Sequence, residues 1–503
     1  MVYHLKNIEI HNQIRTVFLS KNVLIFCALI LYTWCIKKGS VSVKYYLAID
    51  IGASSGRHIL GSVDGGRITT EEIYRFENNL IKTDDGLVWD IKNLITEVKC
   101  GIKKCKEIGK IPVSVAIDTW GVDYVLSDAY GNILEPVYSY RNSRTDTIDA
   151  EVESIISPEK LYSLTGIQKQ KFNTIYQLYC DKKTGKLNQA SSFMMMPAYL
   201  SYCLTGNVYN EYTNATTTGF VNAMTHEFDN DIMSELGFNK TVFDKLKLPG
   251  DYIGDFTEDV QKEIGFNTRV VFCPSHDTAS AVAACPLNDG DIYISSGTWS
   301  LIGCEVLTPV LSDEARKCNF ANEGGINYRF RFLKNYMGMW LFQNIRKNLN
   351  KSLTYDEMMN LAMNADKYYY INVNDPEFVA PENMIDSIKK HLGMPDLSLG
   401  ELLNSVYHSL AKSYNDAICE VEKISGTKSK AIRIVGGGSK DSYLNYLTAK
   451  YTGKKVTAGP VEATALGNLA SQILAENKDL SLADVRNIIK NSFDITEVQN
   501  EQI

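Results

Sequence analysis

The chain has 503 residues, of which 45% are hydrophobic and 22% charged, and its formal net charge is -7. This length exceeds one ordinary hydrophobic core and predicts two or three domains of a globular protein. The acidic balance argues against nucleic acid as a main partner.

The first 43 residues differ in composition from the rest. Residues 23–36 are almost wholly apolar and are flanked by lysines. The run is shorter than the ~20 residues that a membrane span needs, and it lacks the small-residue cleavage motif of a secretory signal. A signal anchor is the alternative. We expect residues 1–43 to be an extension outside the fold, with the protein proper starting near Val43.

The segment from Tyr46 to Gly61 predicts a strand, a tight turn and a second strand. Asp50 lies at the end of the first strand, and the turn contains only small residues. Gly52 and Gly56 permit backbone angles closed to other residues. Such a turn directs several N–H groups at one point and predicts an anion site.

A mixed α/β domain follows. Residues 67–76 alternate as a strand, residues 91–109 carry a helical apolar pattern, and residues 113–117 form a buried strand. Asp118 and Trp120 stand at the end of that strand, where open α/β sheets place ligands. Two interpretations of Trp120 stay open, which are sugar stacking and core packing.

Residues 141–214 are predicted to be mainly helical. The methionine run at 194–196 is expected in the core, whereas the Thr-rich stretch 213–219 is expected to be a polar loop that lines a cleft.

Asp277 marks the candidate chemical centre. A short strand at residues 270–274 leads to it, and an Ala-rich helix follows. We expect Asp277 to cap this helix. A helix N-terminus favours anions, which would keep the carboxylate ionised and able to act as a base.

Residues 291–303 repeat the strand, small polar turn and strand of the first segment. Gly297 falls on Gly52 and Thr298 falls on Ala53. The paired hairpins predict a duplicated fold with a nucleotide held between the halves.

Three later features complete the pattern. Residues 322–325 are predicted to form a tight turn, and residues 330–348 a strand that leads into a helix. An amphipathic helix is expected around residues 402–421. A strand then runs into three glycines at 436–438, against which a flat ring such as adenine could lie.

Several common motifs are absent. The sequence has no Walker A motif, no G-x-G-x-x-G and no H-E-x-x-H. The eleven cysteines lack a C-x-x-C pair and metal-type spacing, which indicates reduced thiols of a cytoplasmic protein.

Residues 52–56 match G-x-S-x-G, the nucleophile elbow of α/β-hydrolases, with Ser54 as nucleophile. The elbow requires a helix directly after the serine, and a strand is predicted there. A serine hydrolase is therefore kept only as a remote alternative.

Taken in order, these motifs resemble the FGGY carbohydrate kinases, which belong to the actin and hexokinase superfamily. The resemblance runs from Lys44 to about Asn477 and includes Lys334-Asn335-Tyr336-Met337-Gly338. The Ala-Ser-Ser-Gly-Arg form at residues 53–57 is similar to the rhamnulokinase group within that family.

The resemblance implies an α/β fold of two ribonuclease-H-like domains with a nucleotide cleft between them. It divides the chain into an N-terminal extension, two kinase domains and a C-terminal helical tail, at residues 1–43, 44–286, 287–480 and 481–503. It implies ATP-dependent phosphorylation of L-rhamnulose at the 1-hydroxyl, with Asp277 as the base.

The resemblance also implies the remaining site residues. The sugar would be held by Gly121, His276, Asp277, Thr278 and Asn335. ATP would be contacted by Ala53, Ser54, Ser55, Gly56, Arg57, Thr298, Gln343 and Gly437. Mg²⁺ would be placed by Asp50, through water.

Other functions remain open at this point. A kinase of another ketose or polyol, such as L-fuculose or D-xylulose, shares the same motifs. A nucleotide-gated binding or chaperone-like protein would share the two hairpins that hold a nucleotide between them, but it would not need the carboxylate of Asp277. A sugar and ATP are the expected partners, membrane binding is not expected, and no motif sets the oligomeric state.

Overall fold

The computed structural model describes residues 43–498. The extension predicted over residues 1–43 therefore lies, apart from Val43, outside the described residues, as do the last five residues of the predicted tail. No helix within residues 43–498 is long and apolar enough to cross a membrane.

Two mixed β-sheets organise these residues. The first sheet has the order β11 (Tyr252–Asp255), β12 (Arg269–Val271), β6 (Pro112–Thr119), β1 (Tyr45–Ile51), β2 (Ser55–Asp64) and β3 (Arg67–Glu77). The second sheet has the order β15 (Ala321–Gly324), β16 (Phe330–Met337), β14 (Trp299–Val306), β13 (Ile292–Ser296), β17 (Ala431–Val435), β18 (Lys455–Ala458) and β19 (Thr496–Glu497). We call residues 45–285, which carry the first sheet, the first lobe, and residues 286–498 the second lobe.

Five strands of each sheet share one pairing pattern. In the first sheet β3, β2 and β1 pair antiparallel, and β1, β6 and β12 pair parallel. In the second sheet β16, β14 and β13 pair antiparallel, and β13, β17 and β18 pair parallel. The duplicated fold predicted from the two hairpins is confirmed.

Helices cover both lobes. Those of the first lobe are α2 (Ile91–Glu107), α3 (Ile148–Ile155), α4 (Pro158–Thr165), α5 (Thr174–Lys183), α6 (Met196–Thr205), α7 (Tyr212–Ala215), α8 (Asn230–Leu236), α9 (Glu258–Ile264) and α10 (Asp277–Ala284). Those of the second lobe are α11 (Asp313–Lys317), α12 (Trp340–Asn348), α13 (Tyr355–Met363), α14 (Met384–Leu392), α15 (Leu399–Ser425), α16 (Ser442–Thr452), α17 (Ala463–Glu476) and α18 (Leu482–Ser492).

Sequence signals explain where the long helices begin and end. The Asp90 side chain accepts a hydrogen bond from the backbone N–H of Asn93 and caps α2. Ser398 and Glu401 form a capping box at the start of α15, and Gly426 ends that helix with a left-handed φ of 71°. The helices predicted from apolar periodicity in these two segments are confirmed.

Three short two-stranded sheets complete the first lobe, built from β4 (Leu80–Thr83) with β5 (Gly86–Trp89), β7 (Tyr124–Ser127) with β8 (Ser192–Met195), and β9 (Asn210–Glu211) with β10 (Leu246–Lys247). The methionine run at 194–196 is fully buried, as predicted. Part of it nevertheless belongs to strand β8, inside a region that the sequence pattern assigns to helices.

The turn predicted at residues 322–325 is wrong. Residues 321–324 are a buried strand, β15, which pairs with β16 at the edge of the second sheet. Two adjacent glycines suggest a turn, but here Gly324 permits close packing, since a Cβ at this position would lie 2.6 Å from the Tyr212 ring.

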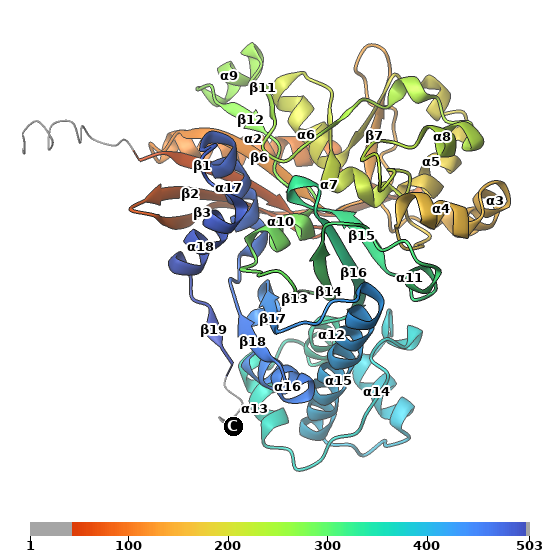
Figure 1. The fold of residues 1–503 in the computed structure, drawn as a ribbon, viewed down its shortest axis with the longest axis vertical. Helices are drawn as coiled ribbons and strands as arrows, with labels where there is room; N and C mark the ends of the chain where they lie inside the picture. The colour runs from red at the N-terminus through yellow and green to blue at the C-terminus, as the bar shows by residue number, and fades with distance from the viewer. Residues whose placement is uncertain (1–42, 499–503) are drawn as a thin grey trace, which may run out of the picture. The chain divides into compact units, whose positions relative to one another are not determined.

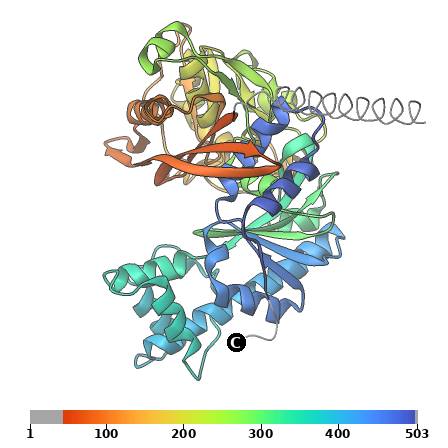
Figure 2. The ribbon, with the colours of Figure 1, turned by 90° about the vertical axis from the view of Figure 1, so that its left-hand side faces the viewer.

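The helices α10 and α17 lie between the two sheets, and both views show α17 beside the strands of the first sheet although it comes from the end of the chain (Figures 1 and 2). One apolar cluster joins Ala48 of β1, Val282 of α10, Leu466 of α17 and Leu333 of β16. The two lobes therefore share a packed core around these helices.

Candidate active site

Asp277 is the first residue of α10. Its Oδ1 accepts hydrogen bonds from the backbone N–H (2.6 Å) and the hydroxyl (3.1 Å) of Thr278, and about a third of its side chain (31%) is exposed. The predicted cap is wrong, because His276 occupies the N-cap position and makes no side-chain cap bond. The carboxylate nevertheless lies at the positive end of the helix dipole, where an anion is stabilised.

The loop before Asp277 rests on α7. The carboxylate of Glu211 accepts hydrogen bonds from the Ser275 N–H (3.0 Å) and hydroxyl (2.6 Å), and the Asn214 amide donates to the Ser275 carbonyl (3.0 Å). Burial raises the pKa of Glu211, and the hydrogen bonds from Ser275 and Thr213 act against that rise. This buried support fixes the backbone on which Asp277 stands.

The polar loop predicted at residues 213–219 is likewise wrong. The stretch forms α7 and a 3₁₀ helix at Thr216–Thr218, and its threonines are buried. The hydroxyls at 216–218 donate to backbone carbonyls three residues earlier, as Thr217 does to Asn214 (2.7 Å), and the Thr213 hydroxyl donates to the Glu211 carboxylate (2.7 Å). Because each hydroxyl is satisfied locally, a Thr-rich stretch can lie beneath the site rather than line it.

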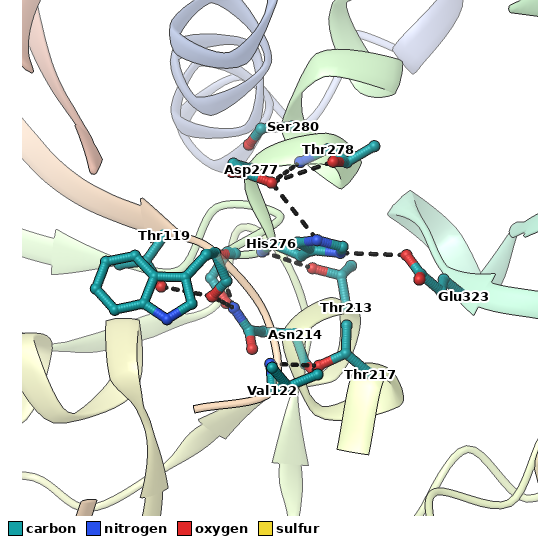
Figure 3. Close-up of polar contacts among 12 residues, drawn as sticks. Thr119, Val122, Thr213, Asn214, Thr217, His276, Asp277, Thr278, Ser280 and Glu323 are labelled. Carbon is teal, nitrogen blue, oxygen red and sulfur yellow. Dashed lines mark hydrogen bonds and ion pairs between the residues drawn. The ribbon is translucent and has the colours of Figure 1, made fainter. Parts of the chain in front are cut away.

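His276 joins the lobes at this point (Figure 3). Its Nε2 lies 3.5 Å from Asp277 Oδ1, and its Nδ1 lies 3.2 Å from Glu323 Oε2 on β15. Arg331 on β16 pairs with the same Glu323 oxygen (2.9 Å). Burial raises the pKa of Glu323, but the charges of Arg331 and His276 outweigh it and lower the pKa to about 2.

The predicted sugar residues do not all lie together. His276, Asp277 and Thr278 are consecutive, and Gly121 packs near them on Thr217, which also accepts from the Val122 N–H (3.0 Å). Asn335 is exposed on β16, four residues along the strand from Arg331, so the two Cα atoms are ~13 Å apart. The structure thus brings Gly121, His276, Asp277 and Thr278 together, and Asn335 lies farther along β16 than Arg331, which contacts His276.

Trp120 belongs to the core. It is 6% exposed, its ring centroid lies 4.1 Å from that of Trp89, and its indole N–H donates to Asp123 (3.0 Å). Of the two interpretations that the sequence left open, core packing is confirmed.

The first hairpin turn lies at residues 52–54. The Gly52 N–H donates to the Ser55 carbonyl (2.9 Å), and the Asn78 amide donates to the Gly52 carbonyl (2.9 Å). Neither Gly52 nor Gly56 has a positive φ, so the turn does not use the backbone freedom that glycine permits in that region. Glycine at 56 has a packing reason instead, because a Cβ would lie 2.1 Å from the Phe76 ring.

Arg57 is held by two carboxylates. Its guanidinium pairs with Asp50 (2.6 Å) on β1 and with Glu462, the N-cap residue of α17. The Arg57 guanidinium, which was predicted to contact ATP, is thus paired with carboxylates of the protein itself. Ala53, Ser54 and Ser55 form the rest of this turn.

The second hairpin opens onto a cavity of about 590 Å³. The predicted ATP residues Gln343 and Gly437 line it beside Gly297, and the Thr298 hydroxyl donates to Gln343 Oε1 (3.3 Å). No atom of residues 43–498 lies within 4 Å of a Cβ built on Gly437, so its backbone faces open space. Gly437 and Gly438 of the triple glycine thus form part of the cavity wall.

Sequence reasoning missed other residues of this cavity and of the His276 contacts. They are Arg346, Tyr355, Asp356 and Asp441 in the cavity, and Glu323 and Arg331 at His276. No local signal marks them, because they reach the site through strand pairing and helix packing.

Two buried carboxylates lie side by side below the first hairpin. Asp50 and Asp118 are register partners on the parallel strands β1 and β6. Asp118 is fully buried; one of its oxygens accepts from the Asn468 amide (2.6 Å) of α17, and Oδ1 has no hydrogen-bond partner among residues 43–498. Burial first, and then repulsion from Asp50 and Asp277, raise the pKa of Asp118 well above its usual range.

This donor set fits a hard divalent cation. Such ions prefer carboxylate oxygens and water as ligands, and a nearby positive charge would stabilise a buried carboxylate that has an unpartnered oxygen. Asp50, predicted from sequence, and Asp118, which was not, are the residues that could hold it.

The hydrolase alternative is excluded. Strand β2 begins at Ser55, directly after Ser54, so the helix that a nucleophile elbow requires is absent at this point.

Comparison with known proteins follows the same division of the chain. The N-terminal domain of the FGGY family of carbohydrate kinases matches residues 45–284, and the C-terminal domain of that family matches residues 292–476.

Relatives match over almost the whole chain. A rhamnulokinase of Halalkalibacterium halodurans is 45% identical over 460 residues, covering 90% of this chain and 98% of its own. A rhamnulokinase of Oceanobacillus iheyensis is 44% identical over 455 residues, with 89% and 97% covered, and one of Bacillus subtilis is 40% identical over 457 residues, with 90% and 94% covered.

Solved structures share the fold. A ligand-bound xylulose kinase of Lactobacillus acidophilus superposes with a TM-score of 0.74 at 16% identity, covering 91% of this chain and 93% of its own. A Plasmodium falciparum glycerol kinase with ADP gives 0.72 at 14% identity, with 91% and 94% covered. By its two matched domains and by relatives of up to 45% identity, the chain belongs to the FGGY family of carbohydrate kinases.

Proposed function

We propose that the chain transfers the γ-phosphoryl group of ATP to the 1-hydroxyl of L-rhamnulose, giving L-rhamnulose 1-phosphate in rhamnose catabolism. The choice of sugar rests on the relatives named rhamnulokinase, which are up to 45% identical. The observation that carries the reaction type is the partly exposed carboxylate of Asp277, which stands within electrostatic range of Asp50 at the first hairpin.

Asp277 acts as the general base. As the sugar oxygen forms its bond to the γ-phosphorus, the bond from that phosphorus to the ADP oxygen breaks, and the hydroxyl proton passes to Asp277. Its Oδ1 is held by Thr278, so the other oxygen can face the hydroxyl. His276, Thr278 and Gly121 surround the sugar, and Asn335 joins them when the lobes approach.

The two hairpins hold the phosphates. Residues 53–56 offer backbone N–H groups and the hydroxyls of Ser54 and Ser55, and Thr298 offers a hydroxyl on the facing hairpin. Gln343 and Gly437 bind the adenosine end in the 590 Å³ cavity. Arg57 holds Asp50 and can turn toward the phosphates when a cation takes over part of that carboxylate's charge.

Asp50 and Asp118 would hold Mg²⁺, which would supply charge neutralisation for the phosphate oxygens. Asn468 of α17 fixes the Asp118 carboxylate in place.

The protein works in the cytoplasm, where ATP is available. The nine cysteines within the described residues all carry free thiols, as expected for a reducing compartment.

A coupled ADP-release assay tests the proposal over L-rhamnulose, L-fuculose, D-xylulose, L-ribulose and glycerol. We expect L-rhamnulose to give the highest kcat/KM, and the product to carry its phosphate at position 1 by ³¹P NMR. A higher kcat/KM for another member of the panel would contradict the choice of sugar. No ADP release with any of them would contradict the sugar kinase activity itself.

A further inference from the structure

Glu323 and Arg331, both residues of the second lobe, form a buried ion pair. They are register partners on the antiparallel strands β15 and β16, and their charged groups lie 2.9 Å apart. Arg331 is fully buried, and its Nε donates to the Gly324 carbonyl (3.0 Å). Backbone pairing sets the position of both side chains. Strand β15 is also anchored to the first lobe, because the Gly324 N–H donates to the Thr216 hydroxyl (2.9 Å).

This pair meets the first lobe at His276. Both Glu323 Oε2 and Arg331 Nη2 lie 3.2 Å from Nδ1 of the ring. Whichever ring nitrogen carries the proton, these contacts at one edge of the imidazole leave its Nε2 edge facing Asp277, at 3.5 Å. The orientation of His276 is therefore set from the second lobe, although its backbone belongs to the first.

We propose that Glu323 and Arg331 are positioning residues of the phosphoryl transfer, which act through His276 to orient Asp277 and the sugar only while the two lobes hold this arrangement. The inference rests on the proposed function and deepens it. Through this buried pair, the alignment of the base Asp277 depends on how the two lobes are arranged.

The chain offers a matched control. Arg486 of α18 and Glu305 of β14 form another buried pair, with two 3.0 Å contacts and side chains about one-tenth exposed. Arg486 also donates to the carbonyls of Val282 and Ala283 at the opposite end of α10 (3.0 and 3.1 Å). A change at Glu305 thus disturbs the same helix through a second-lobe ion pair, but far from Asp277.

A double-mutant cycle tests the inference with the sugar that the wild-type chain phosphorylates best. Glu323→Gln should lower kcat/KM for the sugar by ~10–100-fold, since small displacements of a catalytic group cost this much, while the KM for ATP stays near the wild-type value. In a His276→Asn background the same change should cost less than about threefold, because the group through which Glu323 acts is already gone. Glu305→Gln should lower the melting temperature without changing kcat/KM in either background.

Two results would overturn the inference. One is that Glu323→Gln lowers kcat/KM by the same factor in the wild-type and His276→Asn backgrounds. The other is that a folded Glu323→Gln chain keeps the wild-type kcat/KM. If Glu323→Gln melts below the assay temperature, Arg331→Lys, which keeps the charge but loses the fork of donors, gives the same cycle. If the wild-type chain releases ADP with none of the sugars, the proposed function is contradicted. If the wild-type chain is active but the losses in kcat/KM from Glu323→Gln and His276→Asn simply add, only this inference is contradicted.

Discussion

At the scale of single residues, the adjacent carboxylates of Asp50 and Asp118 are costly to the protein when no cation is bound. Burial is the largest cause that raises the pKa of both groups. Repulsion from Asp50 adds to it at Asp118, and repulsion from Asp277 and Glu462 adds to it at Asp50. Arg57 offsets part of this cost at Asp50, and the Asn468 amide offsets part of it at Asp118. Retaining both charges in this position is consistent with a role in cation binding.

Replacing Asp118 by Asn should separate stability from function. In EDTA at pH 8 the variant should melt at a higher temperature than the wild type, because one of two neighbouring buried charges is removed while the bond to Asn468 is kept. Its ADP release with sugar should fall, and it should need more Mg²⁺ for half-maximal rate. A variant with wild-type Mg²⁺ dependence would remove Asp118 from the cation site.

The buried His58 side chain should make the protein less stable in acid. Burial lowers its pKa to about 4, and its Nε2 lies 3.1 Å from the Val98 carbonyl. The unfolded chain takes up the proton near pH 6.5 and the folded chain only near pH 4, so the free energy of unfolding should fall by about 3 kcal/mol through this residue between pH 7 and pH 4. Urea unfolding of His58→Gln should show a smaller fall than the wild type, and parallel pH profiles would contradict this assignment.

The sequence predicts the residues of local motifs better than their partners. The run from Ser275 to Ala281 identifies the base from its own neighbours, and the structure places His276 and Thr278 beside Asp277. Glu323 and Arg331 escape such analysis, because they meet His276 only through the pairing of β15 with β16 and the contact between lobes.

At the scale of elements, the hairpins are predictable because each is a local unit. Gly52 and Gly297 both follow the last residue of their first strand, and their N–H groups both donate across the turn, to Ser55 and Trp299. β15 is not predictable in the same way, since its strand conformation depends on β16. The buried turns at 213–218 are likewise set by burial rather than by their polar composition.

The helices α10 and α17 cross so closely at Gly467 that one added methyl group should destabilise the protein. A Cβ on Gly467 would lie 1.7 Å from the Ser280 carbonyl oxygen, which is backbone and cannot move aside. Gly467→Ala should therefore lower the free energy of unfolding by about 1–3 kcal/mol, measured by urea denaturation.

Gly437→Ala is the contrasting change at the nucleotide cavity, where an added Cβ meets no atom within 4 Å. It should leave the free energy of unfolding unchanged and weaken ATP binding in calorimetry. If Gly467→Ala were as stable as Gly437→Ala, the close helix crossing would not exist in solution.

At the scale of the whole molecule, the duplicated sheets place one hairpin on each lobe, with α10 and α17 packed between them. Contacts between the lobes near His276 include hydrogen bonds, such as that of the Gly324 N–H to the Thr216 hydroxyl (2.9 Å), and aromatic contacts, such as that of Tyr212 with Tyr328, whereas those around the two helices are apolar. Because each lobe carries one hairpin, we expect ATP and sugar together to draw the hairpins toward each other by a rotation of the lobes.

Small-angle scattering checks this motion. The radius of gyration should decrease when Mg²⁺, a non-hydrolysable ATP analogue and L-rhamnulose are all present, and less with either ligand alone. An unchanged radius with both ligands bound would contradict closure.

The central claim is that Asp277 takes the proton from the sugar hydroxyl. Asp313 provides a matched control, since it is also the first residue of a helix but lies on the exposed α11. The most direct test is ADP release with L-rhamnulose by the wild type, Asp277→Asn and Asp313→Asn at saturating ATP. We expect a loss of ~10²–10⁴-fold for Asp277→Asn, with ATP binding kept and Asp313→Asn unaffected. Turnover of Asp277→Asn within a few-fold of the wild type would contradict it.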